Sequence, residues 1–245
     1  MFQNLGEMTL LFVRALAALP HTWRQRQKVF DQLFEIGNAS LLMVCVLSFF
    51  IGAVITVQIG PSLVERGLAS AVGGLVGFSI SRELAPIMMA VLIAGRVGSS
   101  MAAEIGSMRV YQEVDALRTM NINPIHYLVL PRILAIAIAL PMLVLFSILV
   151  SWLGGAVTAA ATHQIGIGYQ PFFANLREMV DVQDVAHGVF KSFCFSLIIG
   201  TVSCHQGLIT IGGPRGIGRS VTKAVVNSIV LIVISDYFLS RILLK

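Results

Sequence analysis

Long apolar segments alternate with short polar ones along the chain, and this pattern predicts helices that cross a membrane. A helix needs about 20 apolar residues to cross the hydrocarbon core of a bilayer. Five segments reach or approach this length, at about 39–59, 67–95, 133–162, 188–211 and 224–240. The third has 30 uncharged residues, enough for a tilt or for a bend at Pro141. We therefore expect an all-α integral membrane protein with a transmembrane domain over residues 39–245.

Residues 1–38 form a separate N-terminal region in which apolar positions recur at helical spacing. The positions that share one face of a helix are Phe2, Leu5, Phe12, Leu16 and Leu19. This spacing is typical of an amphipathic helix that lies in the cytoplasmic membrane interface, with Trp23 at headgroup level. A frayed tail is the alternative. Since Arg14 lies inside the apolar run and not before it, the region lacks the order of a signal peptide.

Composition and charge agree with a membrane protein. The chain is 56% hydrophobic and 12% charged, about half the charged fraction of a soluble domain. Basic residues number 4, 1, 4, 1, 3 and 2 in the successive segments outside the spans, which favours a cytoplasmic N-terminus and an external C-terminus. The net charge of +5 is therefore a topology signal, not an indication of nucleic acid binding. The three cysteines have neither disulfide nor zinc spacing, so we expect no metal site.

Charged residues inside the spans are the main candidate for a functional site. The segment 67–95 holds eleven Leu, Ile, Val or Phe residues, which favour insertion by roughly 3 to 7 kcal/mol. Its Arg82 and Glu83 together cost roughly 5 to 7 kcal/mol, so their side of the helix must face protein or water. Adjacent residues point about 100° apart, and the two side chains cannot share one partner.

Two other spans carry charges at comparable depth. Glu83 and Asp236 each lie about 18 Å above the expected cytoplasmic end of their segment, at about 1.5 Å per residue. Lys191 enters from the outside. Intramembrane charges of this kind mark pathways or binding sites. A purely structural ion-pair network is the alternative, and for Lys191 so is snorkelling to the outer interface.

The segment between the second and third spans has the features of a docking element. Its apolar positions recur at three-residue spacing, at Met108, Tyr111, Val114, Leu117 and Met120. This pattern predicts a short amphipathic cytoplasmic helix over about 104–120, ending before Pro124. The charged residues available to bind a soluble partner are Glu104, Arg109, Glu113 and Asp115. A helix packed on its own protein is the alternative.

Two further patterns have less specific meanings. Gly213–Ser220 reads GPRGIGRS, close to a phosphate-binding Walker A loop, but the short segments between spans leave no room for the α/β domain that such a loop needs. We interpret it as a glycine-rich turn. Gly73 and Gly77 form a GxxxG pattern, and Ala90 and Ala94 repeat the spacing. Such faces permit close helix contact, either within the chain or in a homodimer.

Two long motifs resemble the MlaE-type permease family, the membrane subunits of bacterial ABC transporters for lipids. The first is RELAPIMMAVLIAGRVGSSMAAEIGSMRVYQEVDAL, from Arg82 to Leu117. The second is GIGRSVTKAVVNSIVLIVISDYFL, from Gly216 to Leu239. The chain departs from the family at Val221 and Thr222, where paired threonines are usual, and at Pro214 and Arg215. Both departures fall in the expected cytoplasmic turn.

The resemblance implies a function and a set of partners. Two copies would form a dimer in the bacterial inner membrane, each bound through the 96–120 region to a separate cytoplasmic ATPase that holds the ATP. A periplasmic MCE-domain protein would exchange phospholipid, or a similar lipid, with the membrane. Arg82, Glu83, Lys191 and Asp236 would line or support the lipid cavity. The chain itself would be a transporter subunit without catalytic residues or a cofactor.

Two other functional classes fit the sequence less well. In an ion-coupled secondary transporter, Glu83 and Asp236 would be the coupling sites, but the two halves of the chain show no inverted repeat. An intramembrane enzyme could use His187 or His205 with nearby serines, but neither GxSxG nor HExxH is present.

Overall fold

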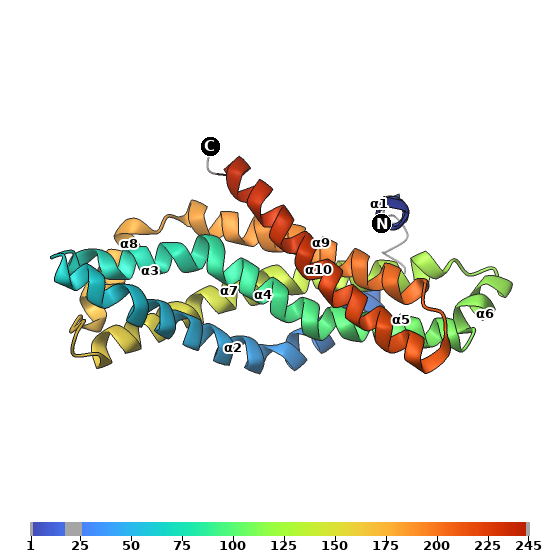
Figure 1. The fold of residues 1–245 in the computed structure, drawn as a ribbon, viewed down its shortest axis with the longest axis horizontal. Coiled ribbons are helices and arrows are strands. Elements are labelled where there is room, and N and C mark those ends of the chain that lie inside the picture. Colours follow the sequence, from blue (N-terminus) through green and yellow to red (C-terminus); the bar gives the residue numbers. More distant parts are fainter. Residues whose placement is uncertain (1, 18–25, 244–245) are drawn as a thin grey trace. The chain divides into compact units, whose positions relative to one another are not determined.

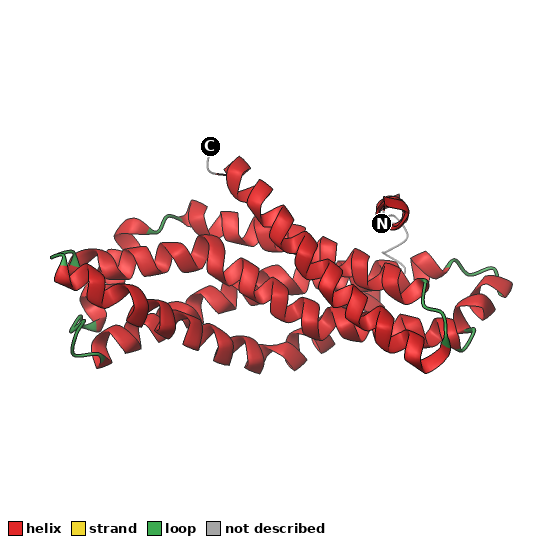
Figure 2. Ribbon diagram, in the orientation of Figure 1, coloured by secondary structure: helices red, strands yellow, loops and turns green. Residues whose placement is uncertain are grey.

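The computed structural model describes residues 2–17 and 26–243, and within these ranges it contains helices and short loops but no strand (Figures 1 and 2). Among the described residues, five helical stretches are long and apolar enough to cross a membrane: Gln27–Glu65, Ala69–Val110, Ile125–Ala161, Val182–Leu208 and Gly213–Leu243. A further helix, α1 (Phe2–Ala17), precedes them. The predicted fold class, an all-α membrane protein with an N-terminal helix, is confirmed. The predicted interfacial positions Leu19 and Trp23 lie outside the described residues.

The helices extend beyond most of the apolar runs that predicted them. The first spanning helix, α2 (Arg26–Glu65), begins well before residue 39, and the last, α10 (Gly213–Leu243), begins before residue 224. Helix growth is cooperative, so a helix continues into polar sequence after it leaves the lipid. By contrast α9 (Val182–Leu208) stops short of residue 211. The turn after α9 contains Gly212 with a φ of 95°, a left-handed conformation that suits glycine.

The second spanning stretch is not one regular α-helix. Its α-helical parts are α3 (Val72–Ser79), α4 (Ala85–Ile93) and α5 (Ser99–Val110). They are joined by two π-helical turns, η3 (Ile80–Leu84) and η4 (Ala94–Gly98). Such turns often occur at functional sites. The first of them contains the two charged residues, Arg82 and Glu83, that the sequence singled out.

The single helix predicted over 104–120 is two helices. The spanning stretch continues to the end of α5, and α6 (Glu113–Thr119) begins after a turn. Gln112 has a left-handed φ of 63°, which ends one helix and starts the next. A three-residue spacing of apolar positions does not reveal such a break, since it persists across the turn. The chain then enters a π-helical turn, η5 (Ile125–Val129), which leads into α7 (Leu130–Ala161).

The chain forms two compact units. The first contains the described residues of 1–38, 90–140 and 193–245. Its buried apolar cluster joins α1, α5, η5, α7 and α9 through Leu11, Ile105, Val129, Ile133 and Cys204. In the same unit α10 packs along α5. The position of Leu11 in this cluster shows that α1 is attached to the unit by an apolar side chain.

The second unit contains residues 39–89 and 141–192. Its helix α8 (Tyr169–Met179), which the sequence analysis did not predict, packs along α3 (Figure 1). A Cβ atom on Gly73 would overlap the backbone of Phe172, and one on Gly77 would lie 3.0 Å from Leu176. The GxxxG face therefore serves packing within the chain. Between α2 and α7, the Ser151 hydroxyl donates a 2.8 Å hydrogen bond to the carbonyl of Ser48.

Candidate functional site: paired charges between η3 and α9

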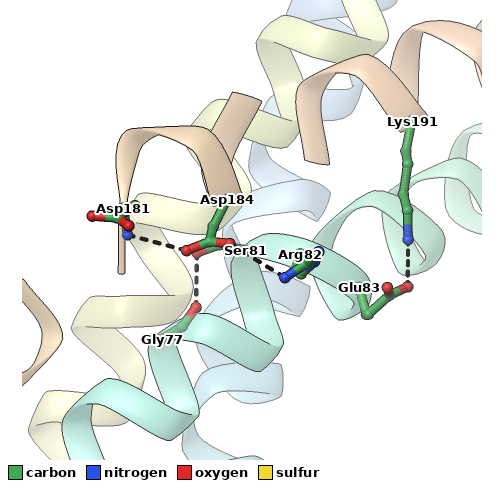
Figure 3. Close-up of polar contacts among 7 residues, drawn as sticks. All are labelled: Gly77, Ser81, Arg82, Glu83, Asp181, Asp184 and Lys191. Carbon is green, nitrogen blue, oxygen red and sulfur yellow. Dashed lines mark hydrogen bonds and ion pairs between the residues drawn. The ribbon is translucent and has the colours of Figure 1, made fainter. Parts of the chain in front are cut away.

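Two ion pairs connect η3 to α9 within the second unit (Figure 3). Arg82 Nη1 lies 3.6 Å from Asp184 Oδ1. Lys191 Nζ donates a 2.6 Å hydrogen bond to Glu83 Oε2. Arg82 and Glu83 are adjacent in sequence and point to different partners, as expected from the rotation of about 100° per residue.

The sequence of α9 places both partners on one face. Asp184 and Lys191 are seven residues apart, close to two turns of helix, so their side chains project in a similar direction. Asp184 also lies in the first turn of α9, where its Oδ2 accepts a 3.1 Å hydrogen bond from the backbone N–H of Asp181. A carboxylate at this position satisfies a helix-terminal N–H and suits the positive end of the helix dipole. Asp184 therefore caps the N-terminus of α9 and compensates the positive charge of Arg82.

Gly188 allows the two elements to come close enough for both pairs. It lies on α9 between Asp184 and Lys191. A Cβ atom at this position would overlap the carbonyl oxygen of Ser81 and would lie 3.2 Å from Cγ of Pro86. The backbone of α9 thus contacts the backbone of η3 directly, as small residues permit between membrane helices.

The two pairs differ in exposure. The Lys191 side chain is 1% exposed and its partner Glu83 is 37% exposed, whereas Arg82 and Asp184 are 16% and 13% exposed. Lys191 is therefore buried and does not snorkel to an interface. Each positive group has a carboxylate beside it, so the four side chains sum to zero charge. This compensation lowers the cost of placing charges in a span.

The structure changes the set of residues that the sequence grouped together. Arg82, Glu83 and Lys191 lie in one cluster of the second unit, and Asp184 joins them. Asp236 is half-buried on α10 in the first unit. Sequence reasoning missed Asp184 because a carboxylate at the start of a span is common. The spacing of seven residues between Asp184 and Lys191, which places both on one helix face, was the available signal.

The residues predicted to couple to an ATPase lie around the turn between α5 and α6. Three of them form ion pairs within the first unit: Glu104 with Arg132 at 2.9 Å, and Arg109 with Asp115 at 2.6 Å. Glu113 is exposed in the first turn of α6. Two large apolar side chains nearby are also exposed, Tyr111 at 67% and Met120 at 61%. An exposed carboxylate and two large exposed side chains thus lie between the α5–α6 turn and the end of α6.

The other candidate residues have structural surroundings. His205 is buried on α9, with its Nε2 3.4 Å from Glu7 Oε2. His187 is half-buried on the same helix, and no group of three or more metal-ligating side chains occurs in the described part of the chain. The glycine-rich stretch forms the start of α10 and comes after helix α9, not after a strand. It therefore lacks the strand that precedes a Walker A loop.

Comparison with known proteins identifies related sequences over most of the chain. A family model described as Permease MlaE matches residues 29–242. A "Probable ABC transporter permease protein" of Synechocystis sp. is 38% identical over 220 residues, covering 90% of this chain and 83% of the relative. One of the same description from Rickettsia felis is 34% identical over 243 residues, covering 99% and 93%. The Arabidopsis thaliana protein named "TRIGALACTOSYLDIACYLGLYCEROL 1, chloroplastic" is 36% identical over 218 residues, covering 89% and 61%.

Proposed function

The chain belongs to the MlaE permease family and is a multi-pass ABC transporter permease, and on that premise we propose that it transports phospholipid or a related lipid. The lipid would pass between the bacterial inner membrane and a periplasmic MCE-domain protein. The family match over residues 29–242 is the observation that carries this proposal. The relative named for trigalactosyldiacylglycerol supports a lipid as the substrate.

A separate cytoplasmic ATPase would supply the energy. The polar segments between the spans of this chain are too short for a nucleotide-binding domain. The segment from the α5–α6 turn to the end of α6 is the proposed docking element, because Tyr111, Glu113 and Met120 are exposed along it. Aromatic and methionine side chains are enriched in protein interfaces. A cytoplasmic position of this docking element agrees with the predicted cytoplasmic N-terminus and periplasmic C-terminus.

The paired charges would border the lipid cavity of a dimer formed by two copies. Glu83, the more exposed partner of its pair, would face the cavity, while buried Lys191 holds it in place. A lipid phosphate can compete with Asp184 for Arg82, because both anions accept charge-assisted hydrogen bonds.

A reconstituted transport assay tests the proposal. The chain, co-purified in mild detergent with an ATPase subunit, is placed in proteoliposomes that contain a fluorescent phospholipid. We expect phospholipid transfer that requires ATP and an MCE-domain acceptor. Glu113→Arg should release the ATPase and abolish transfer while the permease still inserts. Glu178→Arg, which changes an exposed carboxylate on α8, is the matched control and should retain both.

Two results would contradict the proposal. One is transfer by the chain alone under an ion gradient, which would indicate a secondary transporter. The other is ATP hydrolysis by the complex that no phospholipid alters and that drives no transfer. In that case the family assignment would stand and the lipid assignment would fall.

A further inference from the structure

A cavity in the first unit is lined by basic side chains from separate parts of the chain. Its volume is about 520 Å³. Arg14 reaches it from α1, Arg118 from α6 and His126 from η5. The described residues that line it include no carboxylate. The cavity therefore has a positive lining that favours an anion.

The first turn of a long helix adds to this positive potential. Asn123, Pro124 and Ile125 line the cavity and lie where the continuous helix Ile125–Ala161 begins. The side chain of Asn123 accepts a 3.0 Å hydrogen bond from the N–H of Ile125. The positive end of a helix dipole attracts anions. Here it acts together with two guanidinium groups, which match the oxygens of a phosphate in two-point hydrogen bonds.

The surroundings of Arg14 favour a lipid as the source of the anion. Leu11 holds α1 against the buried cluster of the unit, while Leu10 and Val13 are 56% and 59% exposed. Exposed apolar side chains on an amphipathic helix of a membrane protein face the boundary between headgroups and acyl chains. Arg14 lies four residues after Leu10, so the two side chains project from the same face of α1. An anion in the cavity can therefore belong to a molecule whose acyl chains lie along this face of α1.

Arg118 can bind an anion without leaving a carboxylate uncompensated. It lies 3.4 Å from Asp115 and its side chain is 61% exposed. Asp115 has a closer partner in Arg109, at 2.6 Å. If Arg118 turns toward a phosphate, Asp115 keeps that partner.

We propose that this cavity binds the phosphate headgroup of an anionic membrane phospholipid. Arg14 and Arg118 contact the phosphate oxygens, and the lipid's acyl chains lie against Leu10 and Val13. None of the residues of the paired-charge cluster lines this cavity. The bound lipid is thus a ligand additional to the transported one, and the inference does not depend on what the permease transports.

Lipid titration of the full chain tests this site. The detergent-solubilised protein is titrated with phosphatidylglycerol, and with phosphatidylcholine of the same acyl chains, and bound lipid is counted by native mass spectrometry. We expect tighter binding of phosphatidylglycerol. Arg14→Gln and Arg118→Gln should each weaken it by roughly fivefold, as expected when one basic residue near a membrane surface is removed. Arg219→Gln, an exposed arginine on α10 that does not line the cavity, is the matched control and should bind as the wild type does.

The lipid affinities of the variants and a competition with inorganic phosphate decide the proposal. Arg14→Lys keeps the charge but loses the planar fork, so it should bind more tightly than Arg14→Gln and less tightly than the wild type. Equal phosphatidylglycerol affinity in the wild type and both glutamine variants would overturn the site. A competition arm contains inorganic phosphate. If millimolar phosphate displaces the lipid that depends on Arg14 and Arg118, the site is one for soluble phosphate and the lipid assignment is overturned.

Discussion

Two ion pairs of this protein have the same length and different surroundings. Glu83 and Lys191 meet at 2.6 Å, as do Arg109 and Asp115. The Lys191 side chain is 1% exposed, whereas the side chains of Arg109 and Asp115 are 30% and 47% exposed. Removing one partner of a buried pair costs about 3–5 kcal/mol, but an exposed pair contributes only about 0–1 kcal/mol. The distance between two charges therefore does not measure their contribution to stability, and burial decides it.

The helix contact that brings the buried pairs together offers the largest perturbation. Gly188→Ala places a Cβ atom on the carbonyl oxygen of Ser81, so α9 and η3 must separate and both pairs must lengthen. We expect a loss of about 4 kcal/mol in the free energy of unfolding, more than the roughly 1–3 kcal/mol of overpacking alone. The measurement is thermal unfolding in detergent. Unfolding is monitored by the reaction of the buried Cys204 thiol with a fluorogenic maleimide.

A second glycine provides the control for this substitution. A Cβ atom on Gly218 of α10 meets nothing within 4 Å. Gly218→Ala should therefore stabilise the protein by up to about 1 kcal/mol, since alanine favours a helix over glycine. Equal effects of the two alanine substitutions would show that α9 does not pack on η3 as described.

Neutralising the buried pair from one side has the next largest effect. Glu83→Gln removes the carboxylate beside the buried ammonium of Lys191 and should cost about 3 kcal/mol. The double variant Glu83→Gln/Lys191→Met should regain much of this loss, because the buried charge is removed as well. A double-mutant cycle of unfolding free energies measures the coupling. A coupling energy near zero would contradict a structural role for the pair.

Breaking the exposed pair of Arg109 and Asp115 should change the free energy of unfolding least. Asp115→Asn is expected to change the unfolding free energy by about 0.5 kcal/mol, because water screens the charges of Arg109 and Arg118 already. High salt should reduce even this difference. A loss above about 2 kcal/mol for Asp115→Asn would show that the turn between α5 and α6 depends on its ion pairs as the η3–α9 contact does.

The spans were predictable because lipid imposes a strong and simple constraint. Apolar segments that reach or approach the spanning length marked the five long helices of the described residues, and the two charges at Arg82 and Glu83 were conspicuous in one of these segments. Elements outside the lipid were harder to predict. Helix α8 has 11 residues, with Phe172, Leu176 and Met179 at helical spacing. That spacing was an available signal, but it is weak over three turns.

Contacts between distant segments were not predictable from periodicity. The sequence identified Gly73 and Gly77 as a packing face but left the partner open between a homodimer and the chain itself. That choice depends on whether another helix of the same chain fits the face, and the position of α8 answers it. Similarly, the break at Gln112 comes from a left-handed backbone in a residue other than glycine. Glutamine rarely adopts this conformation, so a glutamine at this position does not predict a break in the helix.

The π-helical turn η3 has a consequence for the direction of the residues on either side of it. A π-turn amounts to one residue inserted into an α-helix, which shifts the angular phase of all later residues in the helix by about 100°. Gly73 and Gly77, which precede η3, pack against α8. Ser81 lies in η3 and Pro86 follows it, and both pack against Gly188 of α9. Deleting one residue from η3 would give α3 and α4 a single helical phase. Its two packing faces could then no longer match both neighbours at once, even though every remaining residue kept its identity.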